Sequence, residues 1–162
     1  MEITLKNLQK KVPIPRGRIL KAARAALRTL MRDRHSLFLI KNSKKIKSVC
    51  PLLSIVFVGT KRMRAINKKY LGHDYVTDVL TFDLGENIGE IIICPRIARA
   101  QAQAHQTTTE NEIILYVIHG ILHLGGFDDR RSKDKIKMRF MEKELLKGLD
   151  SRFRGNDNQG SL

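Results

Sequence analysis

The chain has 162 residues, about the size of one domain, and 42% of them are apolar while only 11 are Gly, which excludes disordered and fibrous proteins. No apolar run approaches the ~18 residues of a membrane-spanning helix, the polar start Met1–Thr4 is not a signal peptide, and two cysteines, Cys50 and Cys94, cannot build a disulfide framework or a cysteine zinc site. Lys and Arg outnumber Asp and Glu by 31 to 16, so the sequence predicts a globular, cytoplasmic and strongly basic protein.

The first third of the chain predicts an edge strand and a basic helix. Residues 2–8 alternate weakly, as an edge strand does, and a helix is expected from Arg16 to about Arg32. One face of this helix is apolar and consists of Ile19, Leu20, Ala23, Leu27, Leu30 and Met31. Basic side chains recur on the opposite face at spacings of three and four: Lys21, Arg24, Arg28 and Arg32. Residues 36–40 are compatible with a short strand.

The positive charge is concentrated in the N-terminal part of the chain. Residues 1–69 carry 19 basic and two acidic side chains, a balance of +17, whereas residues 70–162 carry 12 and 14, a balance of −2. Like charges repel, so an excess of this size costs stability unless a polyanion neutralises it. The interpretation favoured here is therefore that this region binds nucleic acid, rather than that it is only a solvated helix face or binds an anionic membrane surface. Aromatic residues make up 6% of the chain and Trp is absent, so base stacking is not expected to be the main mode of binding.

The middle of the chain predicts three strands separated by a helix and a turn. The strands are expected at Leu52–Val58, Val79–Phe82 and Glu90–Cys94. Thr60 is expected to cap a short basic helix that ends around Tyr70, and a turn at residues 85–87 joins the last two strands.

The last third predicts three helices. Pro95 suits the first turn of a helix that runs to about Gln106, and Thr109 with Glu112 has the form of a capping box that begins the next helix. A last helix, near residues 133–149, shows apolar side chains along one side: Ile136, Phe140, Leu145 and Leu149. Strands and helices are interleaved, so we expect an α+β fold in one domain over residues 1–150, with about four strands in a small mixed sheet and about five helices. Residues 151–162 are expected to form a flexible tail.

The most informative segment is His119–Asp129, which reads HGILHLGGFDD. Four residues advance a helix by about 400°, so His119 and His123 share one face, one turn apart, as two imidazoles that grip one metal ion must. Gly126 can adopt the positive φ that ends a helix, and the turn can bring Asp129 back as a third ligand. Three protein ligands leave a position open for water, as in a catalytic zinc site.

A buried histidine is more often a core residue whose ring nitrogens are hydrogen-bonded than a metal ligand. Here the helix around Ile113–Leu124 is apolar nearly all round, so two buried histidines need a strong reason to be there. A shared divalent metal ion supplies that reason, and Zn²⁺ is the expected ion, although imidazole and carboxylate ligands also suit nickel and other first-row metals.

The segment lacks the general base of the H-E-x-x-H proteases. The corresponding position is Gly120, which cannot accept a proton. Asp128 is the nearest candidate, either as a base or as a residue that orients a ligand. A metal-bound water beside a basic surface favours cleavage of a phosphodiester over cleavage of a peptide.

Three blocks of the sequence resemble the YbeY family in their order and spacing, and the resemblance covers roughly residues 2–148. They are the metal-ligand segment, the segment Asn67–Phe82 (NKKYLGHDYVTDVLTF) and the strand Gly89–Ile93 (GEIII). The resemblance implies an α+β fold, a metal-dependent endoribonuclease, and a role in the maturation of ribosomal RNA.

Three positions depart from the family pattern. The third ligand position, commonly His, is Asp129; the Arg that often follows the Tyr is Leu71; and the Pro before Thr-Asp is Val76. Asp is a competent ligand for zinc, so we expect that Asp129 in place of His alters the metal affinity or the metal preference of the site and does not abolish it. Leu71 cannot pair with phosphate, and Lys68 or Lys69 is the expected substitute. Thr77 and Asp78 are expected to have a structural role in the turn beside the site.

The sequence therefore predicts a single-strand endoribonuclease that acts on ribosomal RNA precursors, in particular at the 3′ end of the small-subunit RNA, and that takes part in ribosome quality control. The side chains expected to hold the RNA are Lys21, Arg24, Arg28, Arg32, Arg62, Lys68 and Lys69. Two alternatives stay open: a non-catalytic ribosome assembly factor with a structural metal, and a metalloprotease-like hydrolase.

Overall fold

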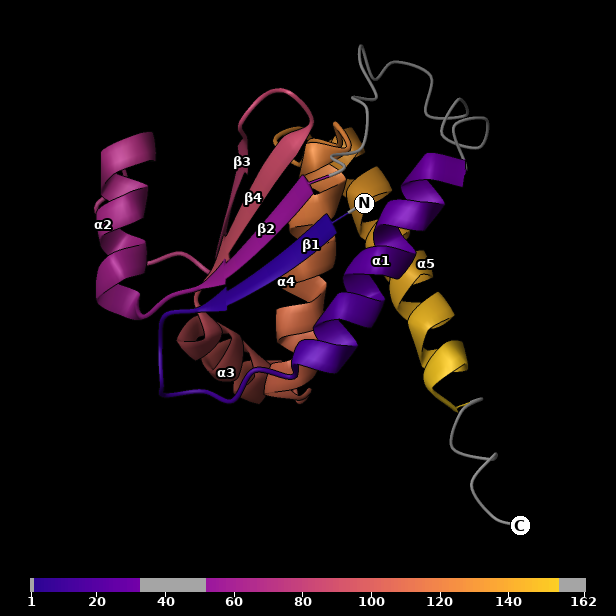
Figure 1. Ribbon diagram of the computed structural model, residues 1–162, viewed down its shortest axis with the longest axis horizontal. Coiled ribbons are helices and arrows are strands. Elements are labelled where there is room, and N and C mark those ends of the chain that lie inside the picture. Colours follow the sequence, from indigo (N-terminus) through magenta and orange to yellow (C-terminus); the bar gives the residue numbers. More distant parts are fainter. Residues whose placement is uncertain (1, 33–51, 155–162) are drawn as a thin grey trace.

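The computed structural model describes residues 2–32 and 52–154, and in them four strands and five helices. The expected strand at residues 36–40, and Cys50, lie outside the described residues. In chain order the elements are β1 (Glu2–Asn7), α1 (Arg16–Arg32), β2 (Leu52–Phe57), α2 (Thr60–Leu71), β3 (Val79–Asp83), β4 (Ile88–Ile93), α3 (Pro95–Ala104), α4 (Thr109–Leu124) and α5 (Ser132–Arg154) (Figure 1).

The strands form one mixed sheet in the order β1-β2-β4-β3. β1 pairs in parallel with β2, β2 in parallel with β4, and β3 antiparallel with β4. Ile55, on β2, lies opposite Leu5 and Ile91, so the same face of three strands carries large apolar side chains. The α+β fold with a mixed sheet is confirmed, and β1 lies at an edge as expected.

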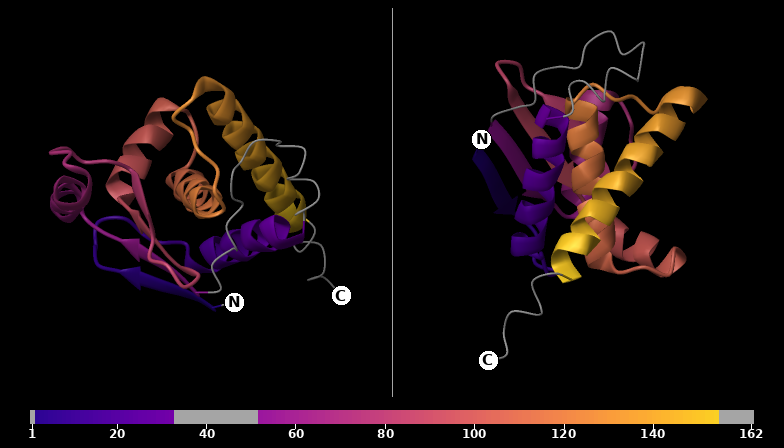
Figure 2. Two further views of the ribbon diagram at one scale, coloured as in Figure 1. Left: turned by 90° about the horizontal axis from the view of Figure 1, so that it is seen from above. Right: turned by 90° about the vertical axis from the view of Figure 1, so that its right-hand side faces the viewer.

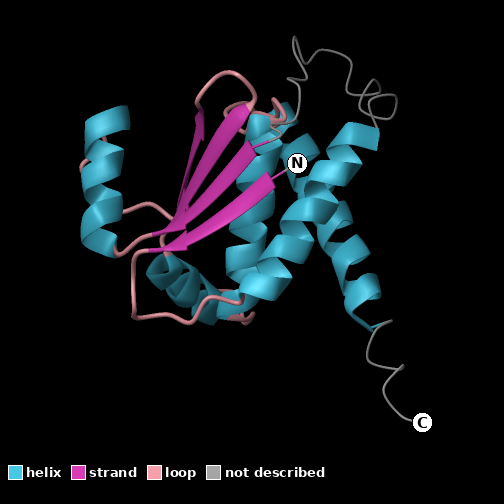
Figure 3. Cartoon of the chain, viewed as in Figure 1, coloured by secondary structure: helices cyan, strands magenta, loops and turns pink. Residues whose placement is uncertain are grey.

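Helices cover the two faces of the sheet unequally. α2 lies alone on one face, and α1, α4 and α5 lie on the other, where α4 is the central helix (Figures 1 and 3). The view from above shows α4 enclosed between the sheet, α1 and α5 (Figure 2). Because other elements cover most sides of α4, most of its side chains are apolar. Its residues include Ile113, Val117 and Ile121, which are fully buried.

The main core lies between the sheet and α4. It joins apolar side chains of α1, such as Ile19 and Leu27, to Phe57 and Ile91 of the sheet. A smaller core beneath α2 contains Met63. In the described part of the chain, no helix combines the length and the apolar character that crossing a bilayer requires.

Several local expectations need correction. The cap of α4 is Thr108, whose hydroxyl accepts a hydrogen bond from the Asn111 backbone N–H, so the capping residue is one position earlier than Thr109. α2 is preceded by Gly59 and has no side-chain cap, so Thr60 is the first helical residue.

The apolar side expected for α5 is confirmed at Leu145 and Leu149 and is wrong at Ile136 and Phe140. Ile136 and Phe140 are 68% and 62% exposed, whereas Met138, Leu145 and Leu149 are buried. The inward face of α5 therefore repeats at 138, 142, 145 and 149, which places an acidic residue, Glu142, among apolar ones. α5 continues through Arg154, beyond the expected end at 149, and residues 155–162 lie outside the described residues.

Candidate metal centre

The buried helix α4 positions the two histidines. His119 and His123 lie in its last two turns, and their rings meet edge to face with centroids 4.6 Å apart. After Leu124 the chain reverses at Gly126, whose φ of 93° is the left-handed conformation that favours glycine. Backbone hydrogen bonds from Gly126 to His123 and from Phe127 to Leu122 close this turn. The turn returns the chain towards the histidines.

Three side chains converge at this end of α4. The Nε2 atoms of His119 and His123 are 3.0 Å apart. The Asp129 carboxylate oxygens lie 3.9 Å from each of these nitrogens. One ligand atom from each of the three residues lies within 4.8 Å of the others, so the cluster can surround one cation. The predicted convergence of His119, His123 and Asp129 is thus present in the fold.

The outer nitrogens of both imidazoles face hydrogen-bond acceptors. His119 Nδ1 lies 2.7 Å from Glu142 Oε1, and His123 Nδ1 lies 3.1 Å from the Phe127 carbonyl oxygen. When Nδ1 carries the proton in each ring, both Nε2 lone pairs point into the cluster and repel each other at 3.0 Å. A divalent cation between them removes this repulsion, so the donor set fits a metal ion.

The protonation state of His123 also suits metal binding. Burial, and next the nearby His119, lower the pKa of His123 from its ordinary value of 6.5. A neutral imidazole is the form that ligates a metal, so the environment already holds this side chain in its ligating form.

Gly120 lies between the two histidines and faces the sheet. A Cβ at this position would lie 2.8 Å from Cδ1 and 2.9 Å from Cγ2 of Ile91, which is fully buried on β4. Any side chain at this position would therefore require the buried Ile91 side chain to shift. This contact is a steric reason for the glycine at the position where H-E-x-x-H proteases carry their base.

A cleft of about 210 Å³ opens beside His119 and Asp129. Its walls also carry Asp78 and Glu142, and two basic residues of α5, Lys135 and Arg139. The sequence analysis missed Glu142 as a partner of His119, and it missed both basic residues. The signal for Glu142 was its helical spacing with Met138 and Leu145, both of which are buried.

Asp128, the candidate base, is engaged elsewhere. Both of its carboxylate oxygens accept hydrogen bonds from the Arg130 guanidinium, and an ion pair of 2.8 Å joins the two side chains. This pairing lowers the pKa of Asp128 to about 2. A carboxylate with so low a pKa is a weak proton acceptor near neutral pH.

The turn between α2 and β3 leads into the cleft. The Asp78 carboxylate accepts hydrogen bonds from the Thr77 hydroxyl at 2.9 Å and from the Val79 backbone N–H at 2.8 Å. These bonds are consistent with the structural role expected for Thr77 and Asp78. Leu71, at the end of α2, is 51% exposed.

The predicted RNA-binding side chains are distributed over several surfaces. On α1, Arg24 and Arg28 are exposed and Lys21 is partly buried. Arg32 ends α1, and its side chain lies outside what the structure describes.

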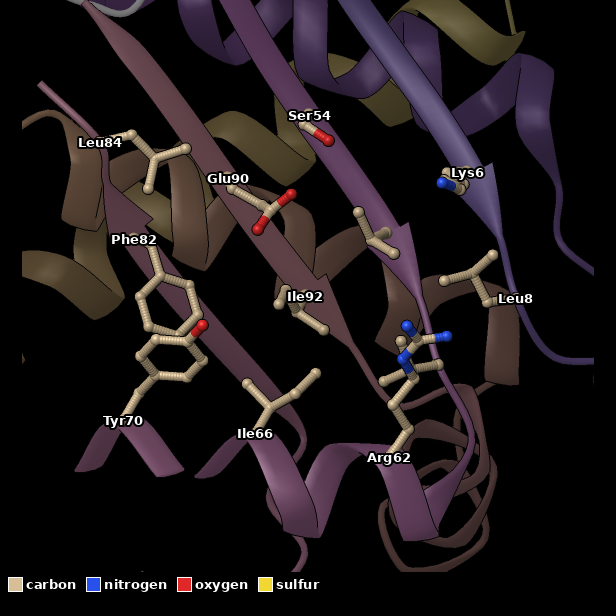
Figure 4. A pocket seen from close by; sticks show the side chains of 12 residues that line it. Lys6, Leu8, Ser54, Arg62, Ile66, Tyr70, Phe82, Leu84, Glu90 and Ile92 are labelled. Carbon is tan, nitrogen blue, oxygen red and sulfur yellow. The ribbon is translucent and has the colours of Figure 1, made fainter. Parts of the chain in front are cut away.

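The basic side chains of α2 have separate surroundings. Lys68 pairs with Asp74 at 2.9 Å, and the Lys69 ammonium lies 5.1 Å from the centroid of the Tyr70 ring. Arg62 does not line the metal cleft but lies in a different cavity, of about 510 Å³, between α2 and the sheet. Figure 4 shows Arg62 and Lys6 at one end of that cavity, Tyr70 against Phe82 at the other, and Glu90 between them.

Comparisons with known proteins all point to one family. The sequence profile of a family described as "Endoribonuclease YbeY" matches residues 5–150. A protein of that name from Thermotoga neapolitana is 40% identical over 94 residues, covering 57% of this chain and 62% of the relative. One from Thermodesulfovibrio yellowstonii is 40% identical over 106 residues, covering 60% and 67%. One from Thermotoga sp. strain RQ2 is 35% identical over 115 residues, covering 67% and 75%.

The fold also has a counterpart among solved structures. The solution structure of a Thermotoga maritima protein aligns with a TM-score of 0.58 and 25% identity, and the alignment covers 99% of this chain and all of the other.

Proposed function

The chain belongs to the endoribonuclease YbeY family, and on that basis we propose that it is a metal-dependent endoribonuclease that cuts single-stranded RNA. The observation that carries the proposal is the convergence of His119, His123 and Asp129, two of which, His119 and Asp129, line a cleft. The whole chain has a net charge of +15, which favours a polyanionic substrate.

Each residue of the centre has a distinct role in this proposal. His119, His123 and Asp129 hold the cation, and the set of two nitrogens and one oxygen favours Zn²⁺. A bound Zn²⁺ supplies Lewis acidity and lowers the pKa of water. Glu142 holds the His119 ring with Nε2 turned towards the cluster, and the Phe127 carbonyl does the same for His123.

The proposed substrate is ribosomal RNA before its maturation, with the 3′ end of the small-subunit RNA as the site of action. The proposed partner is accordingly the small ribosomal subunit, and the proposed location is the cytoplasm. The exposed Arg24 and Arg28 on α1 are proposed contacts to the RNA backbone, and Lys21, Arg32, Arg62, Lys68 and Lys69 are proposed as further contacts at other places on the surface. Phosphate contacts of this kind position an RNA without reading its sequence.

The test is cleavage of a single-stranded ribosomal RNA precursor fragment by the purified protein, with and without Zn²⁺. We expect cleavage by the zinc-loaded protein and none by His119→Ala. His105→Ala is the matched control, because His105 is 62% exposed and is not part of the metal cluster. Equal cleavage by wild type and His119→Ala would overturn the proposal.

The alternative of a non-catalytic assembly factor with a structural metal has one observation in its favour. Gly120 has no side chain and Asp128 is held by Arg130, so neither residue offers a free base. The ligands are partly exposed, however, at 26%, 28% and 40% for the side chains of His119, His123 and Asp129, and the core packs without them. Chelation should therefore leave the circular dichroism spectrum and the cooperative unfolding transition in place, whereas a structural metal would make both collapse.

A further inference from the structure

The first half of α5 forms one wall of the metal cleft. Lys135 and Arg139 are four residues apart on this helix, so their side chains lie one turn apart on the same face. Both line the cleft, together with His119 and Asp129. They are the two Lys or Arg residues of the described chain that line it.

Two of the three acidic groups of the cleft, Asp78 and Glu142, already have hydrogen-bonding partners, and the third, Asp129, faces the two histidines, whereas the two basic groups have no acidic partner among the described residues. Asp78 accepts bonds from Thr77 and Val79, and Glu142 lies 2.7 Å from His119 Nδ1. Within the described ranges, neither Lys135 nor Arg139 forms a side-chain hydrogen bond or an ion pair.

Two other lysines of α5 do have acidic partners. Lys137 pairs with Asp134 at 3.5 Å, and Lys147 pairs with Glu144 at 3.1 Å. Lys135 and Arg139 are therefore two exposed cations without an ion-pair partner in the described chain, and an anion in the cleft could pair with both.

We propose that Lys135 and Arg139 form a phosphate subsite that holds the phosphodiester of single-stranded RNA against the metal ligands. The subsite rests on the proposed function, whose RNA it positions. The planar guanidinium of Arg139 can bind two phosphate oxygens at once, and the Lys135 ammonium adds a point charge one turn away. Charge that develops on the phosphate oxygens during cleavage would be stabilised by the same groups.

This assignment also supplies cations beside the metal ligands that the end of α2 does not supply. Lys68 pairs with Asp74, Lys69 lies over the Tyr70 ring, and Leu71 carries no charge. None of these three residues lines the metal cleft, whereas Lys135 and Arg139 do. The phosphate contact beside the metal ligands is thereby assigned to α5, and Lys68 and Lys69 remain proposed contacts elsewhere on the RNA.

The first experiment measures binding without cleavage. The probe is a single-stranded 2′-O-methyl RNA oligonucleotide, titrated by fluorescence anisotropy against the metal-free and the zinc-loaded protein over a range of salt concentrations. Lys135→Gln and Arg139→Gln should each reduce the slope of log K against log salt by about 0.7, and the double variant should weaken binding about tenfold. Arg139→Lys keeps the charge and should restore the slope. Lys133→Gln is the matched control, since Lys133 is an exposed base on the same helix that does not line the cleft.

The second experiment measures cleavage by the same variants. Arg139→Gln should lower kcat by roughly 10- to 100-fold, beyond its effect on binding, because the guanidinium acts on charge that grows in the transition state. The folded state of each variant is checked by circular dichroism and thermal unfolding, and both positions are exposed, so the variants should fold.

The outcomes separate the subsite from the proposed function. If RNA binding and cleavage change equally in Lys133→Gln and in the two cleft variants, the subsite is wrong. If wild type cuts RNA in a His119-dependent way while the cleft variants bind and cut normally, the function stands and the subsite fails. If wild type never cuts RNA but binding depends on Lys135 and Arg139 alone, the subsite stands and the proposed function fails.

Discussion

Glu142 Oε1 lies 2.7 Å from His119 Nδ1, and this contact joins α5 to the metal centre on α4. The Glu142 side chain is only 15% exposed, so the interaction is protected from solvent. It fixes both the orientation of the ring and the tautomer that presents Nε2 to the cluster.

Glu142→Gln should therefore weaken Zn²⁺ binding by about 10- to 100-fold, because the neutral amide orients the imidazole less firmly and does not increase its basicity. The affinity is measured by competition with a chromophoric chelator. Glu144→Gln serves as the control, since Glu144 is 47% exposed and pairs with Lys147 at the surface. Equal affinities for wild type and Glu142→Gln would show that His119 needs no such partner.

Gly120→Ala should destabilise the protein by about 1–3 kcal/mol, because the new Cβ overlaps the side chain of Ile91, which is fully buried on the inner strand β4. The measurement is chemical denaturation followed by circular dichroism. Gly148→Ala, in α5, is the control: its Cβ would meet nothing within 4 Å, and the change should stabilise the helix by about 1 kcal/mol.

The steric reason for Gly120 can be isolated by a double-mutant cycle. Ile91→Ala removes the three side-chain atoms that approach the new Cβ, so Gly120→Ala should cost less free energy in that background than in wild type. Strict additivity of the two changes would refute the contact. The same contact predicts that Gly120→Glu, which recreates the H-E-x-x-H pattern, produces a misfolded protein and no protease.

Tyr116 carries a buried hydroxyl that has no hydrogen-bond partner in the described chain. Its ring lines the metal cleft and is 6% exposed. Burial, with a smaller contribution from Asp78, raises the pKa of Tyr116, so the hydroxyl stays protonated. Tyr116→Phe removes the unsatisfied group and should stabilise the fold by about 1 kcal/mol, read from the shift in the denaturation midpoint.

The control for this change is Tyr70→Phe, because the Tyr70 side chain is 59% exposed and its hydroxyl is solvated in both the folded and the unfolded state. The free energy of unfolding of Tyr70→Phe should not differ measurably from that of wild type. A loss of stability in Tyr116→Phe would mean that the hydroxyl has a bonded partner, such as an ordered water molecule.

The parts of the site that the sequence predicts are those governed by local geometry. The spacing of His119 and His123 follows from the helical repeat, and the return of Asp129 follows from the conformational freedom of Gly126. The capping residue was displaced by one position because Thr108 and Thr109 are chemically equivalent caps, and only the backbone at Thr108 is extended.

The parts that the sequence does not predict depend on tertiary contacts. Glu142 becomes a partner of His119 only because α5 lies across the end of α4, and its apolar neighbours Ile136 and Phe140 suggested a different inward face. Lys135 and Arg139 were indistinguishable in sequence from other lysines and arginines of a basic chain. The need for glycine at position 120 likewise comes from a tertiary contact, because a Cβ there would overlap the side chain of Ile91, some thirty residues earlier in the chain.

A last prediction concerns the turn that carries Asp78 into the cleft. Within this turn Asp74 pairs with Arg64 at 2.7 Å and with Lys68 at 2.9 Å. These hydrogen bonds, first that of Arg64 and next that of Lys68, lower the pKa of Asp74 from 3.8 to about 2. Because the folded value is the lower one, the pairing contributes its full stabilisation above about pH 4 and loses it as the pH falls through about 2. All three side chains are exposed, so salt should weaken the effect.

The measurement is an NMR titration of the Asp74 carboxyl carbon. In wild type we expect a midpoint near 2, and in Arg64→Gln a midpoint that rises towards 3.8, because the guanidinium supplies the largest part of the shift. Lys61→Gln is the matched control on the same helix, since Lys61 is not a partner of Asp74. A wild-type midpoint near 3.8 would show that the three side chains do not pair in solution. The turn before Asp78 would then be held chiefly by the Asn67 side-chain amide, which donates to the Tyr75 carbonyl at 3.0 Å.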